Sequence, residues 1–117
     1  MIWVVLYMLL FGGGDASLAR PAVQKAVVEP ARLAKAEAIL TQVDEALAEH
    51  RAQREQAFAA WCELAKRRDV TKAELQARIE ACAAANAAFD ARLVELRFAL
   101  RDVLTRAEWQ QVFPAPK

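Results

Sequence analysis

The sequence predicts an all-α protein, a long antiparallel helical hairpin followed by a short C-terminal helix. Its composition favours helices, because Ala, Glu, Arg, Leu and Gln are strong helix formers and Gly and Pro are scarce after position 30. Apolar residues recur with heptad spacing along two long segments joined by a short connection. Because a short connection makes long helices antiparallel neighbours, the two segments should fold back on each other. A chain of 117 residues has room for one domain with a modest core.

Residues 1–19 predict export. Residues 1–11 contain no charged side chain, and the glycines from Gly12 to Gly14 interrupt any helix that they form. This run is too short to cross a bilayer, since about 20 helical residues are needed. With the small residues that flank Leu18, it matches either a secretory signal peptide cleaved after Ala19 or an anchor at the inner membrane through residues 1–14. A helix end packed into a cytosolic core is the remaining alternative.

Residues 20–29 predict a flexible tether, because they contain Pro21, few large apolar residues and no strong period. Pro30 suits the first turn of a helix, where its missing N–H is not needed. From there to about Arg68 the apolar residues follow a heptad, which predicts a helix of about 55 to 60 Å. Its core positions are Leu33, Leu40, Leu47 and Trp61 in one set, and Ala36, Val43, Ala57 and Leu64 in the other.

A second helix is predicted to begin at Thr71. Thr71 as N-cap, Glu74 three residues later, and Val70 with Leu75 as a hydrophobic staple make a complete start signal. Its heptad runs to Val103, with Asn86 as one polar interruption. The apolar core positions are Leu75, Cys82, Phe89, Leu96 and Val103 in one set, and Ile79, Leu93 and Leu100 in the other.

The same start signal recurs at Thr105 and Glu108, and it predicts a third helix of roughly two turns that ends before Pro114. Residues 30–113 thus form the predicted hairpin domain, and residues 114–117 form a tail. Two helices of this length bury only one stripe each, so part of the apolar stripe of a monomer would stay wet. We therefore expect a homodimer.

Three polar residues interrupt the predicted seam. His50, the only histidine, falls within it, and Arg54 follows one turn later. If the chain turns near residue 70, Asn86 lies level with Arg54. Such a layer fixes the register of the helices, opens the seam to water, or lines a ligand site. A divalent transition metal normally needs several ligands, so His50, with Glu49 and Glu55 nearby, is only a single candidate metal ligand.

The two cysteines lie on opposite predicted helices near the tip. The same turn places Cys82 level with Phe58 and leaves Cys62 about one turn nearer the tip. This register does not favour a disulfide, which needs Cα atoms within about 7 Å, whereas an oxidising compartment would encourage one. An intrachain disulfide and two unpaired or intermolecular thiols both remain open. A CxxC motif is absent from the sequence.

The sequence carries no known catalytic motif and is not expected to be an enzyme. It has no Ser-His-Asp order, glycine-rich phosphate loop or HExxH motif. The 16 basic and 15 acidic residues are interspersed, which argues against a nucleic-acid binder. Arg97 and Arg101 belong to a basic series that forms either a solvated face or a surface for unfolded clients. Trp109 and Phe113 should cover apolar surface on the hairpin or on a partner chain.

The C-terminal segment RDVLTRAEWQQVF resembles the periplasmic Spy/CpxP group, which includes zinc-resistance-associated and CnrX-like heavy-metal resistance proteins. Members of this group are long helical hairpins with an LTxxQ motif at helix starts. Residues 104–108, LTRAE, match this motif with Glu in place of Gln. Residues 40–44, LTQVD, are similar to a degenerate first copy, although they lie inside a predicted helix. The likeness covers residues 30–113.

What the resemblance implies is a dimeric periplasmic stress or heavy-metal response protein. It would act as an ATP-independent chaperone or as a regulatory partner of a membrane signalling system, and the alternative is a sensor of Ni, Co, Zn or Cu. The metal-sensing members are rich in His and Met, whereas this chain has one His and no Met after residue 19, so protein binding is favoured. A structural coiled-coil protein is a further alternative. No cofactor is expected, and the predicted partner-binding residues are Arg54, Arg97, Arg101, Trp109 and Phe113.

Overall fold

The computed structural model describes residues 19–113, which form four helices and no strand. They are α2 (Ala19–Ala26), α3 (Pro30–Lys66), α4 (Lys72–Val103) and α5 (Arg106–Val112). The all-α prediction is confirmed for these residues. All of the predicted export segment (residues 1–19) except Ala19, and the predicted tail at 114–117, lie outside them. No helix within residues 19–113 is both long and apolar enough to cross a membrane.

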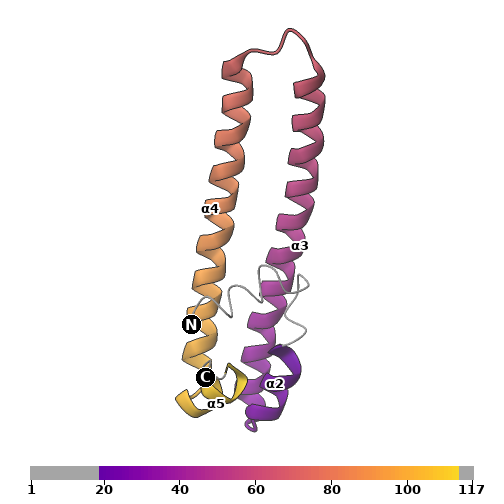
Figure 1. Cartoon of the computed structure of the whole chain (residues 1–117). Helices are drawn as coiled ribbons and strands as arrows, with labels where there is room; N and C mark the ends of the chain where they lie inside the picture. Colours follow the sequence, from indigo (N-terminus) through magenta and orange to yellow (C-terminus); the bar gives the residue numbers. More distant parts are fainter. Residues whose placement is uncertain (1–18, 114–117) are drawn as a thin grey trace.

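The two long helices lie side by side and run in opposite directions (Figure 1). Together they give the molecule an elongated shape with extents of 61 × 29 × 21 Å. The short helices α2 and α5 pack at one end, beside the start of α3 and the end of α4. The link between α3 and α4 forms the opposite end. We refer to residues 51–88 as the distal half and to the remaining described residues as the proximal half.

The helices begin where the capping residues predict. The Thr71 hydroxyl accepts a hydrogen bond from the backbone N–H of Glu74 at 3.2 Å and caps α4. At α5 the Thr105 hydroxyl accepts from the Glu108 N–H at 3.2 Å, and the Glu108 carboxylate accepts from the Thr105 N–H at 2.8 Å. This reciprocal pair is the capping box that the sequence indicates. The predicted starts of all three helices are confirmed, and α3 ends at Lys66, close to the predicted end.

The prediction of a flexible tether at residues 20–29 is wrong for most of that segment. Residues Ala19–Ala26 form α2, and Val23 and Val27, one turn apart, are fully buried against the core. Polar contacts to α3 add to this packing: Arg20 pairs with Asp44 at 2.9 Å, and Gln24 donates to Glu37 at 2.7 Å. The apolar side chains of α2 do gather on one face, but this amphipathic pattern spans only about two helical turns, too short to repeat as a heptad.

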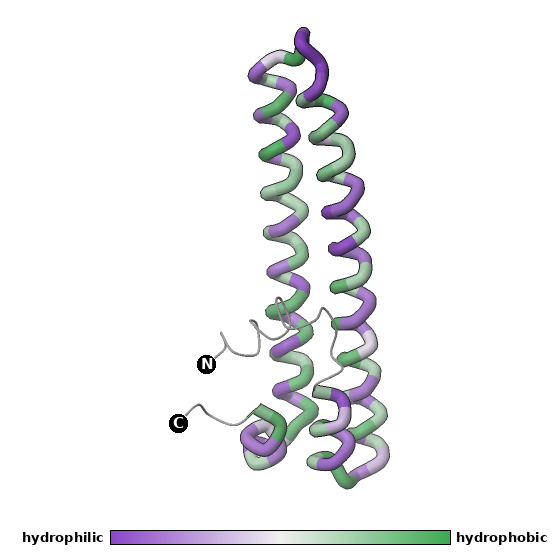
Figure 2. The backbone as a smooth tube through the Cα atoms, turned by 45° about the vertical axis from the view of Figure 1, so that its right-hand side comes forward, coloured by the Kyte–Doolittle hydropathy of each residue, from purple (hydrophilic) through white to green (hydrophobic). Residues whose placement is uncertain are grey.

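The core occupies the proximal half alone. There α3 and α4 close over the heptad positions that the sequence predicts, and the apolar colour in Figure 2 lies on their facing sides. Apolar side chains of α2 and partly buried side chains of α5 cover the end of this core. Its buried members are Val23, Val27, Ala36, Leu40, Val43, Ala46, Leu47, Phe89, Leu93, Leu96, Leu100 and Leu104.

The predicted seam does not close in the distal half. Residues 48–88 contain no buried residue, although the heptad continues through Trp61 and Leu64 on α3 and through Leu75 and Ile79 on α4. Residues 81–88 of α4 read ACAAANAA, so they offer only small or polar side chains. Large side chains on α3 find no large partner there, which explains why burial stops where the sequence of α4 becomes alanine-rich.

An ion pair in the proximal half joins the start of α3 to α5. The Nη1 atom of Arg32, at the start of α3, donates to the Glu108 carboxylate of α5. The Nε atom of Arg32 donates to the Glu29 carboxylate at 2.8 Å. The same Glu108 carboxylate also closes the capping box of α5. The Arg32 guanidinium and the Thr105 N–H together hold the pKa of Glu108 at about 2, while the two carboxylates raise the pKa of Arg32.

Glu108→Gln is expected to lower the free energy of unfolding by about 1 to 2 kcal/mol near neutral pH, because it removes the charge that Arg32 faces while keeping a capping side chain. Since the folded pKa of about 2 lies below the ordinary value of 4.5, the unfolded chain takes up the proton first as the pH falls. The stabilisation is therefore complete above the ordinary value and disappears as the pH falls towards about 2. Urea denaturation of both proteins across this range measures it, and a difference that stays constant would contradict the assignment.

Candidate functional site

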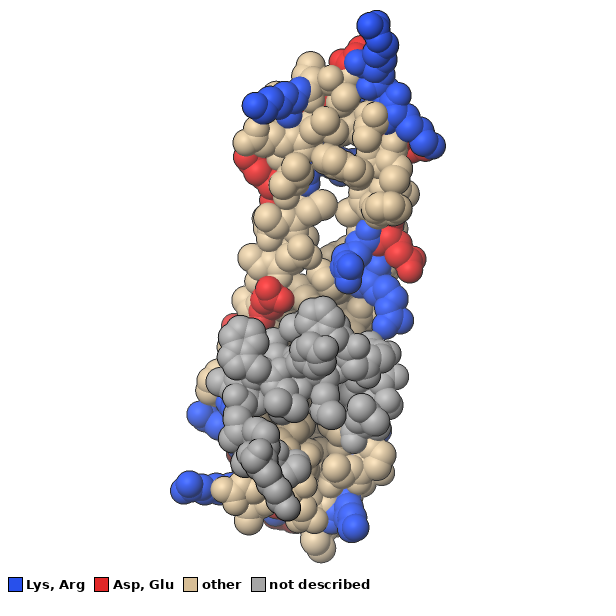
Figure 3. All heavy atoms as spheres, viewed as in Figure 1, with Lys and Arg blue, Asp and Glu red and all other residues tan. Residues whose placement is uncertain are grey.

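A cavity of about 900 Å³ lies between α3 and α4 in the distal half. It occupies the region where the two helices run together without closing, and Figure 3 shows openings between them there. Both helices contribute to its wall, α3 from His50 to Trp61 and α4 from Arg78 to Asn86. The complete lining is His50, Arg51, Gln53, Arg54, Glu55, Ala57, Phe58, Trp61, Arg78, Ile79, Cys82, Ala83, Ala85 and Asn86.

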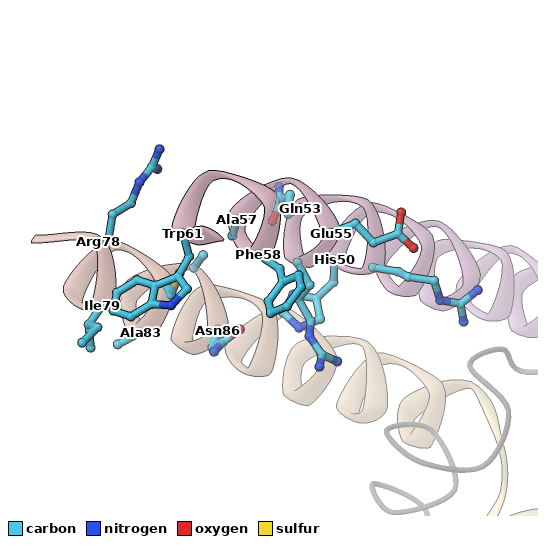
Figure 4. Close-up of a pocket in the computed structure, with 14 residues that line it drawn as sticks. His50, Gln53, Glu55, Ala57, Phe58, Trp61, Arg78, Ile79, Ala83 and Asn86 are labelled. Carbon is cyan, nitrogen blue, oxygen red and sulfur yellow. The ribbon is translucent and has the colours of Figure 1, made fainter. Parts of the chain in front are cut away.

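Large apolar side chains of this cavity are exposed to water. Phe58 is 70% exposed and Ile79 is 56% exposed, whereas Trp61 is half-buried. Figure 4 shows Phe58, Trp61 and His50 extending from α3 towards α4. A wet apolar patch rimmed by polar residues is typical of an interaction site on a soluble domain. The distal half thus exposes apolar side chains that the core does not cover.

The predicted polar layer is present at the proximal end of this cavity. His50, Arg54 and Asn86 all line it, as the expected turn position requires. The His50 ring stacks on Phe89 with 3.9 Å between ring centroids and an interplanar angle of 3°. Phe89 is the last buried residue of α4 before the cavity, so this stack marks the boundary between the closed core and the open half.

The surroundings of His50 disfavour its protonated form. Burial lowers the pKa of His50, the nearby Arg54 guanidinium lowers it further, and Asp90 raises it less. Its Nδ1 atom is buried and has no hydrogen-bond partner among residues 19–113. Because the unfolded chain binds the proton more readily than the folded chain, this histidine costs stability as the pH falls below its ordinary value of 6.5.

An NMR titration should therefore give His50 a pKa below 6.5, and Arg54→Gln should move that pKa upwards because it removes the repelling charge. His50 is the only histidine, so its ring protons are assigned without ambiguity. Arg68→Gln, at the exposed end of the link, is the matched control and should leave the titration unchanged. An unshifted pKa in the wild-type protein would show that the ring is not packed as described.

Residues 19–113 do not provide a set of ligands for a metal ion. These residues contain no group of three or more His, Cys, Asp and Glu side chains placed to hold a metal ion. His50, the single candidate ligand of the sequence, packs its ring on Phe89 instead of facing other donors. Cys62 and Cys82 are both free and half-buried.

The other predicted partner-binding residues form a separate cluster in the proximal half. The Arg97 guanidinium lies over the rings of both Phe98 and Trp109, at 4.8 Å from each centroid. Arg101 lies over Phe98 at 4.8 Å and also pairs with Asp102 at 3.1 Å. Trp109 in turn packs on Phe113, with 4.7 Å between centroids. Arg54 belongs to the distal cavity, so the set predicted from the sequence is divided between two surfaces.

Phe58 and Ile79 are candidate site residues that the sequence did not single out as such. Ile79 was a predicted core residue, and Phe58 was used only to mark a level on α3. The alanine-rich stretch of α4 at residues 81–88 is the signal that identifies both as surface residues, because it leaves the large side chains near it without a packing partner.

No family model, curated protein or solved structure matches the chain. The cavity between α3 and α4 has a distinctive chemical character of its own. Its lining combines aromatic and aliphatic side chains with arginines, and Trp and Arg are the residue types that dominate binding energy at protein interfaces. This chemistry suits the capture of an apolar protein segment.

Proposed function

We propose that the chain is a periplasmic stress-response binding protein, similar to the Spy/CpxP group, that acts as an ATP-independent chaperone or as a regulatory partner of a membrane signalling system. In this proposal α3 and α4 work as an antiparallel helical hairpin whose distal half holds a protein segment. The observation that carries the proposal is the open distal cavity, where Phe58 and Ile79 remain largely exposed beside half-buried Trp61.

The different packing of the two halves supports a binding role for the distal half. A well-packed proximal half anchors the two helices, and the distal half projects from it as a pair of arms without a core of its own. Regions with few buried contacts open at low free energy, which suits a surface that must adapt to different partners. Alanines along α4 also allow another chain to approach closely, since they add little bulk.

We further propose that the protein pairs with a second copy through its proximal outer face. Val94 and Phe98 on α4 are exposed apolar residues there, and Arg97 and Arg101 stack on the Phe98 ring. Aromatic residues and arginine are enriched in such interfaces. Export to the periplasm, by a cleaved signal peptide or an inner-membrane anchor, rests on the apolar composition of residues 1–11.

The binding proposal is tested by light scattering of a heat-denatured client enzyme without ATP. The wild-type protein should suppress aggregation at equimolar amounts, and the double variant Phe58→Glu with Ile79→Glu should lose most of that suppression. Both positions are exposed, so the variant should keep its melting temperature. Val28→Glu is the matched control, because Val28 is an exposed valine in the proximal half. Equal suppression by all three proteins would contradict the assignment of the cavity.

A further inference from the structure

The distal cavity has polar groups in its wall that an apolar client alone would leave without partners. We propose that its preferred occupant is a single amphipathic helix that carries a carboxylate within its apolar stripe, placed opposite Arg54. This inference rests on the proposed function, because it concerns the same cavity, and it adds the chemical class of the segment that the cavity selects.

The dimensions of the cavity suit a helix. Its wall on α3 runs from His50 to Trp61, which at about 1.5 Å per residue is a length of roughly 17 Å, or three helical turns. The opposite wall on α4 runs antiparallel to it from Arg78 to Asn86. Two neighbouring helices with an open apolar seam form a groove that a third helix completes, as in other helix-in-groove interactions. A partner helix of about 12 residues would span this length.

The charges of the wall favour an acidic partner. Arg51, Arg54 and Arg78 line the cavity, and Glu55 is its only carboxylate among the described residues. Arg54 lies one turn beyond His50 at a heptad position of the seam, and it forms no ion pair with the described residues. Its guanidinium is exposed in the cavity and close enough to affect the titration of His50. It therefore remains free to receive a carboxylate from a bound segment.

Desolvation of the Arg54 guanidinium on binding should make the cavity select helices that carry a carboxylate. An entirely apolar helix would cover the guanidinium of Arg54 and the amide of Asn86 without supplying an acceptor, and covering an unpaired charge is costly. A carboxylate at the level of this layer would accept from Arg54 through a charge-assisted hydrogen bond. The apolar stripe of the same helix would contact Phe58, Trp61 and Ile79. A site with a fixed polar group rejects ligands that lack its complement, so the layer acts as a specificity filter.

A second copy of the chain is a poorer occupant. In a symmetric pairing of two distal halves about the polar layer, Arg54 of one protomer would meet the Arg54 of its partner, and the two guanidinium groups would repel each other. The arginine excess of the lining would be doubled. This is why we assign the cavity to a separate helical segment and pairing of the chain to the proximal face.

The experiment compares two fluorescent helical peptides of about 14 residues that share one Leu/Ala stripe and differ at its central position, Glu or Gln. Binding to the full chain is measured by anisotropy. The Glu peptide should bind roughly tenfold more tightly than the Gln peptide. Arg54→Gln should abolish this preference, so that the two peptides bind with about equal affinity. Arg68→Gln, which keeps the cavity intact, should preserve it.

Equal affinity of the two peptides for the wild-type protein, or an undiminished preference in Arg54→Gln, would overturn the inference. If neither peptide binds but aggregation is still suppressed through Phe58 and Ile79, the cavity does not receive an amphipathic helix, whereas the proposed function stands. If aggregation is not suppressed either, the proposed function fails with it. Analytical ultracentrifugation tests whether a second copy of the chain occupies the cavity instead. If the Glu peptide dissociates dimers into monomers, a second copy fills the cavity and the inference is overturned.

Discussion

Leu93→Ala is expected to lower the free energy of unfolding by about 3 kcal/mol. Leu93 is 3% exposed and lies in the core between α3 and α4, so its truncation removes buried surface and leaves a cavity that the neighbouring helices cannot fill. A loss of this size is a large part of the stability of a small domain. Urea denaturation followed by circular dichroism at 222 nm, the usual probe of helix content, measures the change from the shift of the midpoint.

Ile79→Ala provides the matched control on the same helix. Ile79 is 56% exposed, and alanine is a better helix former, so the expected change is within about 0.5 kcal/mol of zero. Two aliphatic truncations at equivalent heptad positions of α4 would thus differ severalfold in their effect. If Ile79→Ala cost as much as Leu93→Ala, the distal half would be closed in solution, and the proposed binding cavity would be absent.

The same asymmetry predicts where the chain opens. Amide protons in residues 51–88 should exchange with solvent faster than those of the proximal half, because no buried side chain covers the distal hydrogen bonds. Hydrogen exchange read by mass spectrometry therefore separates an anchored end from an adaptable end. Binding of a helical segment should slow exchange in the distal half selectively.

Local sequence signals predict most of the helix positions. The capping residues Thr71 and Thr105 act within one turn of backbone, so their effect does not depend on the rest of the fold. The heptad predicts the buried members of the proximal core, such as Leu40 and Leu96, because large residues face each other there. Periodicity alone does not establish burial, since it locates a stripe without showing whether the opposite stripe can fill the space. Ile79 follows the period as well as Leu93 does, yet only Leu93 is buried.

The candidate site is only partly evident from the sequence. The polar layer of His50, Arg54 and Asn86 follows from the turn position and is present in the cavity wall. The stacking of His50 on Phe89 and the grouping of Arg97 with Trp109 depend on how side chains from separate helices meet. Such contacts are tertiary, and no spacing rule along one helix encodes them. The partner-binding residues predicted from the sequence therefore lie on two surfaces, with Arg54 in the cavity wall and Arg97 beside Trp109.

Val23→Asp tests the helix that sequence reasoning overlooked. Val23 is 0% exposed in α2, and a carboxylate at that position would face the apolar core without a partner. Because an uncompensated buried charge costs about 3 to 5 kcal/mol, α2 should detach from α3 and α5 to hydrate it. We expect a melting temperature lower by several degrees and rapid tryptic cleavage after Lys25, identified by mass spectrometry.

Val28→Asp separates docking of α2 from a general effect of added negative charge. Val28 lies just beyond the end of α2 and is 86% exposed, so the same substitution there should leave both the melting temperature and the rate of cleavage at Lys25 close to those of the wild-type protein. Equal behaviour of the two variants would mean that α2 does not dock. Since α2 covers the end of the core that holds α3 and α4 together, its detachment should also weaken client binding in the distal half, although no residue of α2 lines the cavity.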